Sequence, residues 1–120
     1  MVIHQGDVLW VDLQGATGSA PAYRRPAVVV QSDAFNQSRI ATIVVVPITS
    51  SLKHADAPGN VRLPQGEANL PRPSVANVSQ LTTVDREQVI GKLGRLSRSR
   101  FDQIINGIQL LLGVEPETER

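Results

Sequence analysis

Arginines and hydroxyl-bearing side chains, not metal ligands or an activated nucleophile, are the residues of this sequence that could do chemistry. Arg24 and Arg25 stand directly before Pro26, and Thr49 and Ser50 follow an apolar run. The full cationic and polar set is Ser19, Arg24, Arg25, Thr49, Ser50, Lys53, Gln80 and Thr83. Donors of this kind suit a substrate that supplies its own nucleophile. RNA is such a substrate, because its 2′-hydroxyl can attack the adjacent phosphate while the protein aligns it and stabilises the developing charge.

Other kinds of site have weak support. The sequence has no cysteine, which excludes disulfides, thiol chemistry and cysteine-based metal sites. His4 and His54 are far apart, and no carboxylate cluster accompanies them. Gly15 and Gly18 lack the third glycine and the following helix of a nucleotide-binding loop. A Ser-His-Asp triad lacks the sequence of a nucleophile elbow. We therefore expect neither a metal nor a cofactor.

The two adjacent arginines stand at the mouth of a predicted strand. Residues 27–30 form a continuous apolar run, which is typical of a strand buried on both faces. Pro26 favours an extended conformation at Arg25. Neighbouring side chains of an extended chain point to opposite faces, so we expect only one of Arg24 and Arg25 to serve the site. An arginine held there could grip a phosphate with its planar fork.

The rest of the pattern predicts short strands and one closing helix. Apolar runs and alternations indicate strands at 6–13, 27–31, 41–48, 61–63, 75–84 and 88–96, with Pro47 ending the third. A helix is expected over about 98–112, with Ser97 as its N-cap and Gly113 as its C-terminal cap. Its apolar stripe would consist of Phe101, Ile104, Ile105, Ile108, Leu111 and Leu112.

These spacings leave no room for the helices of parallel βαβ units. We therefore expect a mainly β fold, a small and mostly antiparallel barrel with its C-terminal α-helix packed at one end. The length of 120 residues suits one domain, which we place at 1–113, with 114–120 as a flexible tail.

Charge and hydropathy limit the possible partners. The net charge is +1, so a polyanion would have to bind a local basic patch and not a global field. The sequence contains no apolar run of about 20 residues and no basic-then-apolar leader. We expect a cytoplasmic protein with no membrane partner.

Six segments follow one another in an order and spacing that form a specific pattern. They are GDVLWVDL at 6–13, Gly18-Ser19, RPAVVVQSD at 25–33 with Asn36, VPIT at 46–49, QLTTVD at 80–85, and the terminal helix. In these segments the chain, over residues 3–112, resembles the MazF/PemK family of toxin–antitoxin endoribonucleases. The resemblance implies an SH3-like barrel of the plasmid-maintenance-toxin (PemK/CcdB-like) type and a homodimer. It also implies metal-independent, sequence-specific cleavage of single-stranded RNA, including messenger RNA, and an antitoxin whose acidic, disordered C-terminal segment occupies the RNA groove.

Carried over position by position, the resemblance assigns catalysis to Arg25 and Thr49. It associates Ser19, Asn36 and Gln80 with the substrate. Together with the side chains proposed from their chemistry, the expected RNA contacts are Ser19, Arg24, Asn36, Ser50, Lys53, Gln80 and Thr83.

Two departures from the family pattern keep alternatives open. Ala20-Pro21 stands where relatives often have Glu-Gln, and Ser79 stands where they usually carry an acid. Both changes remove carboxylates that could help as a base or orient the arginine. One alternative is a non-enzymatic toxin of the same fold that binds and poisons DNA gyrase. The other is a catalytically inactive RNA-binding barrel.

Overall fold

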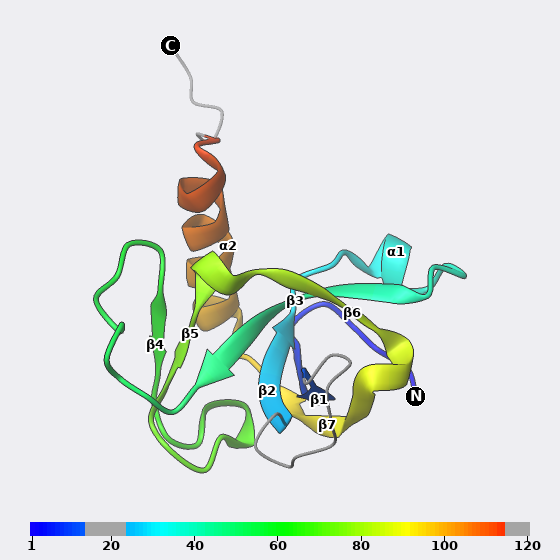
Figure 1. Cartoon of the computed structure of the whole chain (residues 1–120), viewed down its shortest axis with the longest axis horizontal. Coiled ribbons are helices and arrows are strands. Elements are labelled where there is room, and N and C mark those ends of the chain that lie inside the picture. The colour runs from blue at the N-terminus through cyan, green and yellow to red at the C-terminus, as the bar shows by residue number, and fades with distance from the viewer. Residues whose placement is uncertain (14–23, 115–120) are drawn as a thin grey trace.

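The longest strand, β3 (Thr42–Thr49), organises the sheet because it pairs with three other strands along its length. The computed structural model describes residues 1–13 and 24–114 (Figure 1). The other strands in these ranges are β1 (Asp7–Asp12), β2 (Arg24–Val29), β4 (Val61–Leu63), β5 (Ser74–Ala76), β6 (Thr82–Asp85) and β7 (Val89–Arg95). The helices are α1 (Asp33–Asn36) and α2 (Arg98–Leu112), with short 3-10 turns η2 (Glu67–Asn69), η3 (Val78–Gln80) and η4 (Arg86–Gln88).

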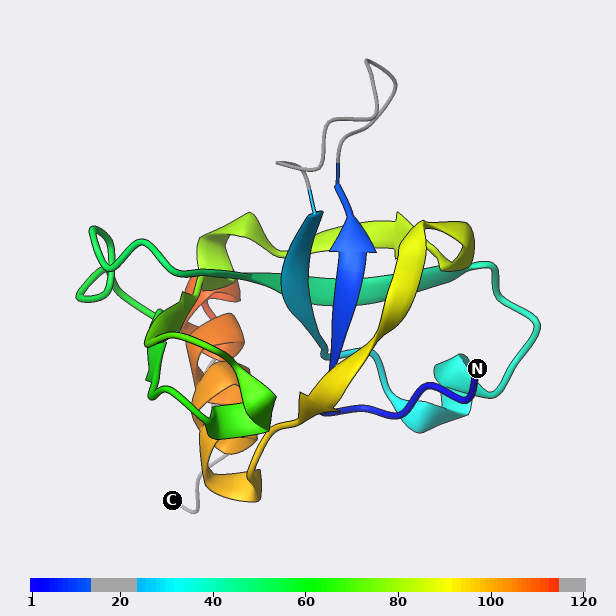
Figure 2. The ribbon, with the colours of Figure 1, turned by 90° about the horizontal axis from the view of Figure 1, so that it is seen from below.

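All strand pairings of the described residues are antiparallel, which confirms the expected sheet type. The strand order is β4-β5-β3-β2-β1-β7, and β6 pairs with the first half of β3. β2 pairs with β3, β1 and β7 follow in the same sheet, and in Figure 2 these three strands run across the long β3. Because β2 and β3 are antiparallel, the first residues of β2 and the last residues of β3 lie at the same end of the sheet.

The two faces of the central strands pack into two separate hydrophobic cores. Val8 and Val28 belong to the core that also receives α2, whereas Leu9 and Val29 belong to the core on the other face. All four side chains are completely buried. The continuous apolar run of β2 is thus explained, because a strand covered on both faces needs apolar residues at every position.

The edge of β7 is covered by η2, and this contact helps the curled sheet to form a barrel. The Asn69 side chain donates a hydrogen bond to the carbonyl oxygen of Leu93 at 3.0 Å. A Cβ atom added to Gly94 would lie 2.4 Å from the carbonyl oxygen of Ala68, so this close approach requires glycine.

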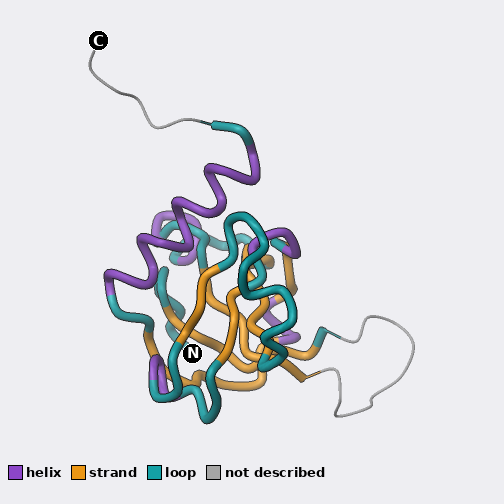
Figure 3. Tube along the Cα trace, turned by 90° about the vertical axis from the view of Figure 1, so that its left-hand side faces the viewer, coloured by secondary structure: helices purple, strands orange, loops and turns teal. Residues whose placement is uncertain are grey.

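The closing helix begins and ends at the predicted residues. Ser97 Oγ accepts a hydrogen bond from the backbone N–H of Arg100 at 3.3 Å. Gly113 adopts a left-handed conformation with φ of +70°. α2 stands beside one end of the sheet and rises beyond it (Figure 3). None of the helices in the described part of the chain is long and apolar enough to span a membrane.

The predicted strand at 75–84 is wrong, since the structure divides it into β5, η3 and β6. Val45 pairs with Thr82 and Ile48 with Ala76, so three residues along β3 correspond to six along this segment. The three extra residues form η3. Its first backbone N–H, that of Val78, donates to the Asn60 side chain at 2.9 Å, a contact that local sequence patterns do not reveal.

Two smaller expectations also fail. Pro47 does not end β3, because it pairs with Ala27 inside the strand and its carbonyl oxygen accepts a hydrogen bond from Asn77 N–H at 2.9 Å. Leu111 and Leu112 do not pack into the core and are 45% and 61% exposed, because the last turn of α2 extends past the sheet. Apart from Val114, the predicted flexible tail lies outside the described residues.

Candidate active site

A cleft opens where β2 begins and β3 ends, and we call it the arginine cleft. It has a volume of about 510 Å³. Its lining consists of Trp10, Arg24, Arg25, Pro26, Ile48, Thr49, Ser50, Ser51, Leu70, Pro71, Arg72 and Ser74. Four of the predicted site residues, Arg24, Arg25, Thr49 and Ser50, are therefore brought together here.

Arg25 and Thr49 are positioned by the pairing of β2 with β3. Ala27 pairs with Pro47 at the end of the antiparallel ladder, and Arg25 and Thr49 each lie two residues beyond this pair and line the same cleft. Buried β-branched residues further along both strands lock this register, because a shift of one residue would turn them out of the core.

Both adjacent arginines line the cleft, so the expectation that only one of them could serve it is wrong. The alternation rule applies to the direction of Cβ and not to the reach of a long side chain at a strand end. One guanidinium N–H of Arg25 donates to the carbonyl oxygen of Arg24 at 3.1 Å, so this side chain folds back along its own strand. Two permanent cations therefore reach one cleft from consecutive positions.

The hydroxyl groups after β3 are oriented by backbone hydrogen bonds. Thr49 Oγ1 accepts a hydrogen bond from Ser51 N–H at 3.1 Å. Ser51 Oγ in turn accepts one from Lys53 N–H at 3.4 Å. Because each oxygen already accepts from the backbone, each O–H remains available as a donor to a ligand.

The described lining of the arginine cleft carries basic and no acidic side chains. Three arginines and four hydroxyl-bearing residues line it, and its described lining includes no aspartate or glutamate. A protein with a net charge of only +1 thus concentrates cations at one place. This arrangement can hold an anion, and guanidinium groups and hydroxyls together match the oxygens of a phosphodiester.

Sequence reasoning missed Arg72, Ser51 and Ser74. Arg72 lies between Pro71 and Pro73, and two fixed proline φ angles hold this arginine in a rigid loop. That flanking pattern was the available signal. The sequence alone does not show where this loop lies. The pairing of β5 with β3 brings the loop, and Arg72 with it, to the cleft.

Other predicted RNA contacts lie outside the cleft. Lys53 is exposed in the turn after Ser51, near the rim. Gln80 ends η3, and Thr83 pairs with Val44, about 16 Å along β3 from Thr49 at about 3.3 Å per residue. Neither of the two lines the cleft. Ser19 and the Ala20-Pro21 departure lie outside the described residues.

Asn36 lies at the opposite end of β2 and is only 5% exposed. Its side-chain amide donates to the Gln31 carbonyl oxygen at 2.9 Å and to Asp33 Oδ1 at 3.1 Å. The Gln31 side chain donates back to Asn36 Oδ1 at 3.0 Å. Burial and this set of partners argue against the expected RNA contact and indicate a structural role.

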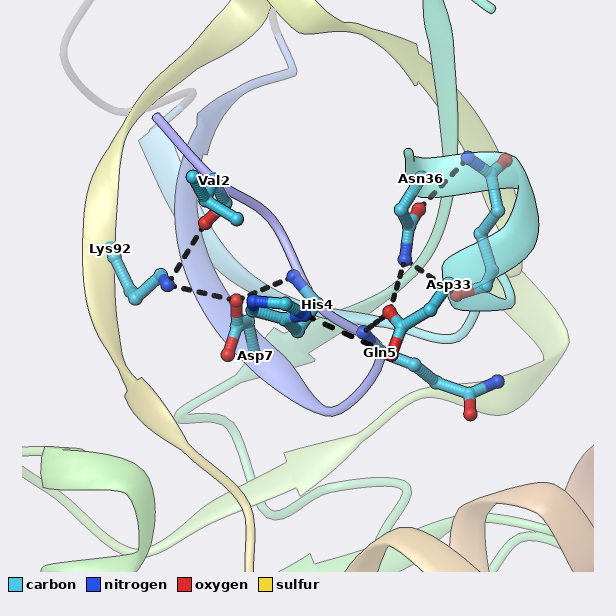
Figure 4. A network of polar contacts seen from close by, with 8 residues as sticks. Val2, His4, Gln5, Asp7, Asp33, Asn36 and Lys92 are labelled. Atoms are coloured by element: carbon cyan, nitrogen blue, oxygen red, sulfur yellow. Dashed lines mark hydrogen bonds and ion pairs between the residues drawn. The ribbon is translucent and has the colours of Figure 1, made fainter. Parts of the chain in front are cut away.

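Asn36 belongs to a second polar cluster, the N-terminal corner, formed by His4, Gln5, Asp7, Asp33, Asn36 and Lys92 (Figure 4). Lys92 Nζ lies 3.0 Å from Asp7 Oδ2, and Asp7 also accepts a hydrogen bond from His4 N–H at 2.8 Å. The backbone N–H of Gln5 donates to Asp33 at 2.7 Å. This bond, aided by the Asn36 amide, lowers the pKa of Asp33 below its ordinary value of 3.8.

The donor set of the cleft does not suit a metal ion. Residues 1–13 and 24–114 contain no group of three or more His, Cys, Asp or Glu side chains that could hold one. Guanidinium and hydroxyl groups can instead supply positive charge and hydrogen bonds directly.

Comparison with known proteins agrees with the fold and identifies the family. Residues 4–112 match the family described as PemK-like, MazF-like toxin of type II toxin-antitoxin system. The chain is 39% identical over 112 residues to endoribonuclease MazF6 of Mycobacterium tuberculosis, a match that covers 93% of this chain and 98% of that protein. The crystal structure of MazF from Deinococcus radiodurans has the same fold, with a TM-score of 0.77 at 23% identity over 95% of this chain and 99% of that one. So does an endoribonuclease in complex with its cognate antitoxin from a mycobacterial species, with a TM-score of 0.74 at 18% identity over 97% and 98%.

Proposed function

Because the chain belongs to the PemK-like, MazF-like family of toxins of type II toxin–antitoxin systems, we propose that it is an endoribonuclease whose active site is the arginine cleft. The substrate is single-stranded RNA, messenger RNA included, cleaved at a specific sequence without a metal ion. The observation that carries the proposal is that Arg25 and Thr49, each two residues beyond the Ala27–Pro47 pair, line one cleft with two further arginines.

The substrate's own 2′-hydroxyl is the nucleophile. Its oxygen forms a bond to the adjacent phosphorus as its proton passes to solvent water, and the bond from phosphorus to the 5′-oxygen breaks. The leaving 5′-oxygen takes up a proton, so the products are a 2′,3′-cyclic phosphate and a 5′-hydroxyl. Catalysis then depends on alignment of the 2′-oxygen and on stabilisation of the pentavalent phosphorus intermediate.

Arg25 is the residue that holds the scissile phosphate in this mechanism. Its guanidinium stays protonated, so it is a poor base and a good clamp for the extra negative charge of the transition state. Thr49 donates its O–H to the same phosphate, because its oxygen already accepts from Ser51 N–H. Arg24, Arg72 and Ser50 bind the neighbouring phosphates and riboses from the cleft walls.

Ser19, Lys53, Gln80 and Thr83 remain proposed contacts to RNA farther from the cleavage point. Lys53 has the clearest support, because its exposed position follows directly on the hydroxyl turn of Thr49 and Ser51. The substrate role of Asn36 is replaced by its structural role in the N-terminal corner.

The protein acts as a homodimer in the cytoplasm. Support for a second copy comes from the end of α2, where Leu110, Leu112 and Val114 are 62%, 61% and 57% exposed. Contiguous exposed apolar residues of this kind commonly mark an interface between proteins. The cognate antitoxin binds the cationic cleft through an acidic, disordered C-terminal segment, which charge complementarity favours.

Cleavage of a long single-stranded transcript in excess EDTA tests the proposal. We expect wild-type protein to cut it at discrete sites that leave cyclic phosphate ends, and Arg25→Ala protein of unchanged thermal stability not to do so. A strict requirement for magnesium, or 3′-hydroxyl ends, would contradict the mechanism. Binding without cleavage would favour the inactive RNA-binding alternative, and inhibition of DNA gyrase without cleavage would favour the gyrase poison.

A further inference from the structure

A second hollow adjoins the arginine cleft on the other side of the start of β5. It has a volume of about 240 Å³ and is lined mainly by Leu52, Arg62, Pro64, Pro73 and Arg100. Nothing in the proposed reaction uses these residues. We propose that this hollow, the outer hollow, binds one nucleotide of the RNA substrate beyond those that flank the scissile phosphate. The inference rests on the proposed endoribonuclease function.

The outer hollow lies next to the cleft. Ser74, the first residue of β5, lines both. In two places consecutive residues divide between them: Ser51 lines the cleft and Leu52 the outer hollow, and Arg72 lines the cleft and Pro73 the outer hollow. An RNA strand that leaves the cleft over Ser74 therefore enters the outer hollow next.

Cationic and apolar side chains alternate along this path, as charged phosphates and apolar base faces alternate along an RNA strand. It begins with the arginines of the cleft, continues over the apolar side chains of Leu52 and Pro73, and ends at Arg62 and Arg100. Leu52 is 47% exposed, which leaves an apolar surface uncovered in the protomer. Single-stranded RNA is bound by cations along its backbone and by flat or apolar surfaces under its bases. The two hollows together hold five of the 12 cationic residues of the chain.

Both arginines of the outer hollow make contacts within the protein. Arg62 forms an exposed ion pair with Asp56 at 3.2 Å. Arg100, in the first turn of α2, donates to the carbonyl oxygen of Arg62 at 3.3 Å and to the Gln103 side chain at 3.3 Å. The Arg100 guanidinium, held by two protein acceptors, can stack on a base or grip a phosphate at a lower entropic cost. The volume is below the range of pockets for drug-sized ligands, which suits a single base.

The test uses RNAs of increasing length around one cleavage site that has been mapped on a long transcript. Each RNA adds one nucleotide on the 5′ or the 3′ side, and kcat/KM is measured with full-length protein. For the wild type we expect kcat/KM to rise at one particular extension. The double variant Arg62→Gln/Arg100→Gln should lose about tenfold on RNAs that include this nucleotide and nothing on the shortest cleaved RNA.

Two further variants distinguish the contributions of guanidinium stacking and of positive charge from unspecific effects of substitution. Arg62→Lys/Arg100→Lys keeps both charges but loses the planar groups, so it should keep the salt dependence of cleavage and lose part of the length dependence. The Gln double variant should instead make the negative slope of log(kcat/KM) against log[salt] shallower, by roughly 0.7 for each phosphate contact removed. Arg98→Gln is the matched control, because Arg98 lies in the same helical turn, pairs with Asp102 at 3.2 Å and has an 88% exposed side chain. It should behave as the wild type.

Each other result overturns the inference. A length profile of the Gln double variant equal to that of the wild type removes the nucleotide site, as does an equal loss on short and long RNAs. If the Gln double variant keeps the length profile of the wild type but is no longer inhibited by an acidic peptide, the outer hollow binds a protein partner and not RNA. Thermal unfolding curves exclude misfolded variants. If the wild type cleaves no RNA at all, the proposed function has failed, and this outcome differs from a failure of the outer hollow alone.

Discussion

The arginine cleft and the N-terminal corner are both polar clusters at the ends of the same central strands, yet their charges are arranged in opposite ways. In the corner, Lys92 pairs with Asp7 at 3.0 Å and His4 lies 3.8 Å from Asp33. In the cleft, three arginines converge and no acid of the described residues lines it. Like charges that gather in one place cost stability through repulsion, and the ion pairs of the corner help to hold the N-terminal segment.

The hydrogen-bond partners of a polar side chain distinguish structural residues from functional residues better than residue type does. Asn36 and Thr49 are both polar and both were expected to serve the RNA. The Asn36 amide uses its donors and its acceptor within the protein. Thr49 Oγ1 accepts one backbone hydrogen bond and keeps its O–H for a ligand. Substitutions in the cleft should therefore change activity, and those in the corner should change stability.

The largest expected effect is that of Arg25→Ala. Loss of a preorganised donor to the transition state typically lowers the rate about 10²–10³-fold, or about 3–4 kcal/mol. Arg25→Lys should recover part of this, because it keeps the charge without the fork. Single-turnover cleavage of a short RNA measures both, with thermal unfolding as the control. Arg24→Ala should mainly raise KM. If Arg24→Ala is inactive and Arg25→Ala normal, the two arginines have exchanged roles.

Thr49→Val should have the next largest effect on cleavage, about 10–10²-fold on kcat, because valine keeps the shape and removes one donor to the phosphate. The same substitution removes the acceptor of Ser51 N–H, so some loss could arise from a displaced turn. Thr49→Ser restores the hydroxyl and should restore most of the rate. Equal rates for valine and serine would exclude a role for this hydroxyl.

Asp7→Asn should lower the free energy of unfolding by about 1–3 kcal/mol and leave cleavage unchanged. Asp7 is 2% exposed, so the substitution leaves the Lys92 ammonium without its buried counter-charge. Urea unfolding at neutral pH provides the measurement. Lys92 is 38% exposed at its side chain and can turn to water, which keeps the effect below that of a fully buried pair. A loss of activity without a loss of stability would contradict the proposed division between the two clusters.

Asn36→Ala should cost about 1–2 kcal/mol of stability, because Gln31 and Asp33 lose their buried partner. Its kcat/KM for RNA, measured at a temperature at which the variant is folded, should equal that of the wild type. A selective rise in KM would return Asn36 to the RNA-binding surface.

The smallest expected effect is the contribution of Asp33 to the pH dependence of stability. Its pKa is lower in the folded protein than in the unfolded chain, so the unfolded chain binds a proton first as the pH falls. The stabilisation is complete above the unfolded value near 4 and is lost as the pH drops below it. Asp33→Asn should therefore unfold with a weaker pH dependence between about pH 5 and 2 than the wild type. Parallel curves for the two proteins would show that the carboxylate is not coupled to folding.

Local physical signals in the sequence determined much of this protein. Ser97 and Gly113 set the ends of α2, because an N-cap hydroxyl and a left-handed glycine act within a few residues. Continuous β-branched runs set the buried strands, and with the family pattern they put Arg25 and Thr49 at strand ends. These features depend on neighbours along the chain, which the sequence displays directly.

Contacts between distant segments decided the rest. The break in the segment 75–84 depends on an Asn60 side chain, and the place of Arg72 in the cleft depends on the position of β5 beside β3. The exposure of Leu110 and Leu112 depends on where the sheet stops supporting α2. A side chain's burial, partners and reach are properties of the packed chain. For this reason residue type and spacing could nominate Asn36 and Thr49 equally, and only the tertiary structure could place one in a satisfied network and the other in a cationic cleft.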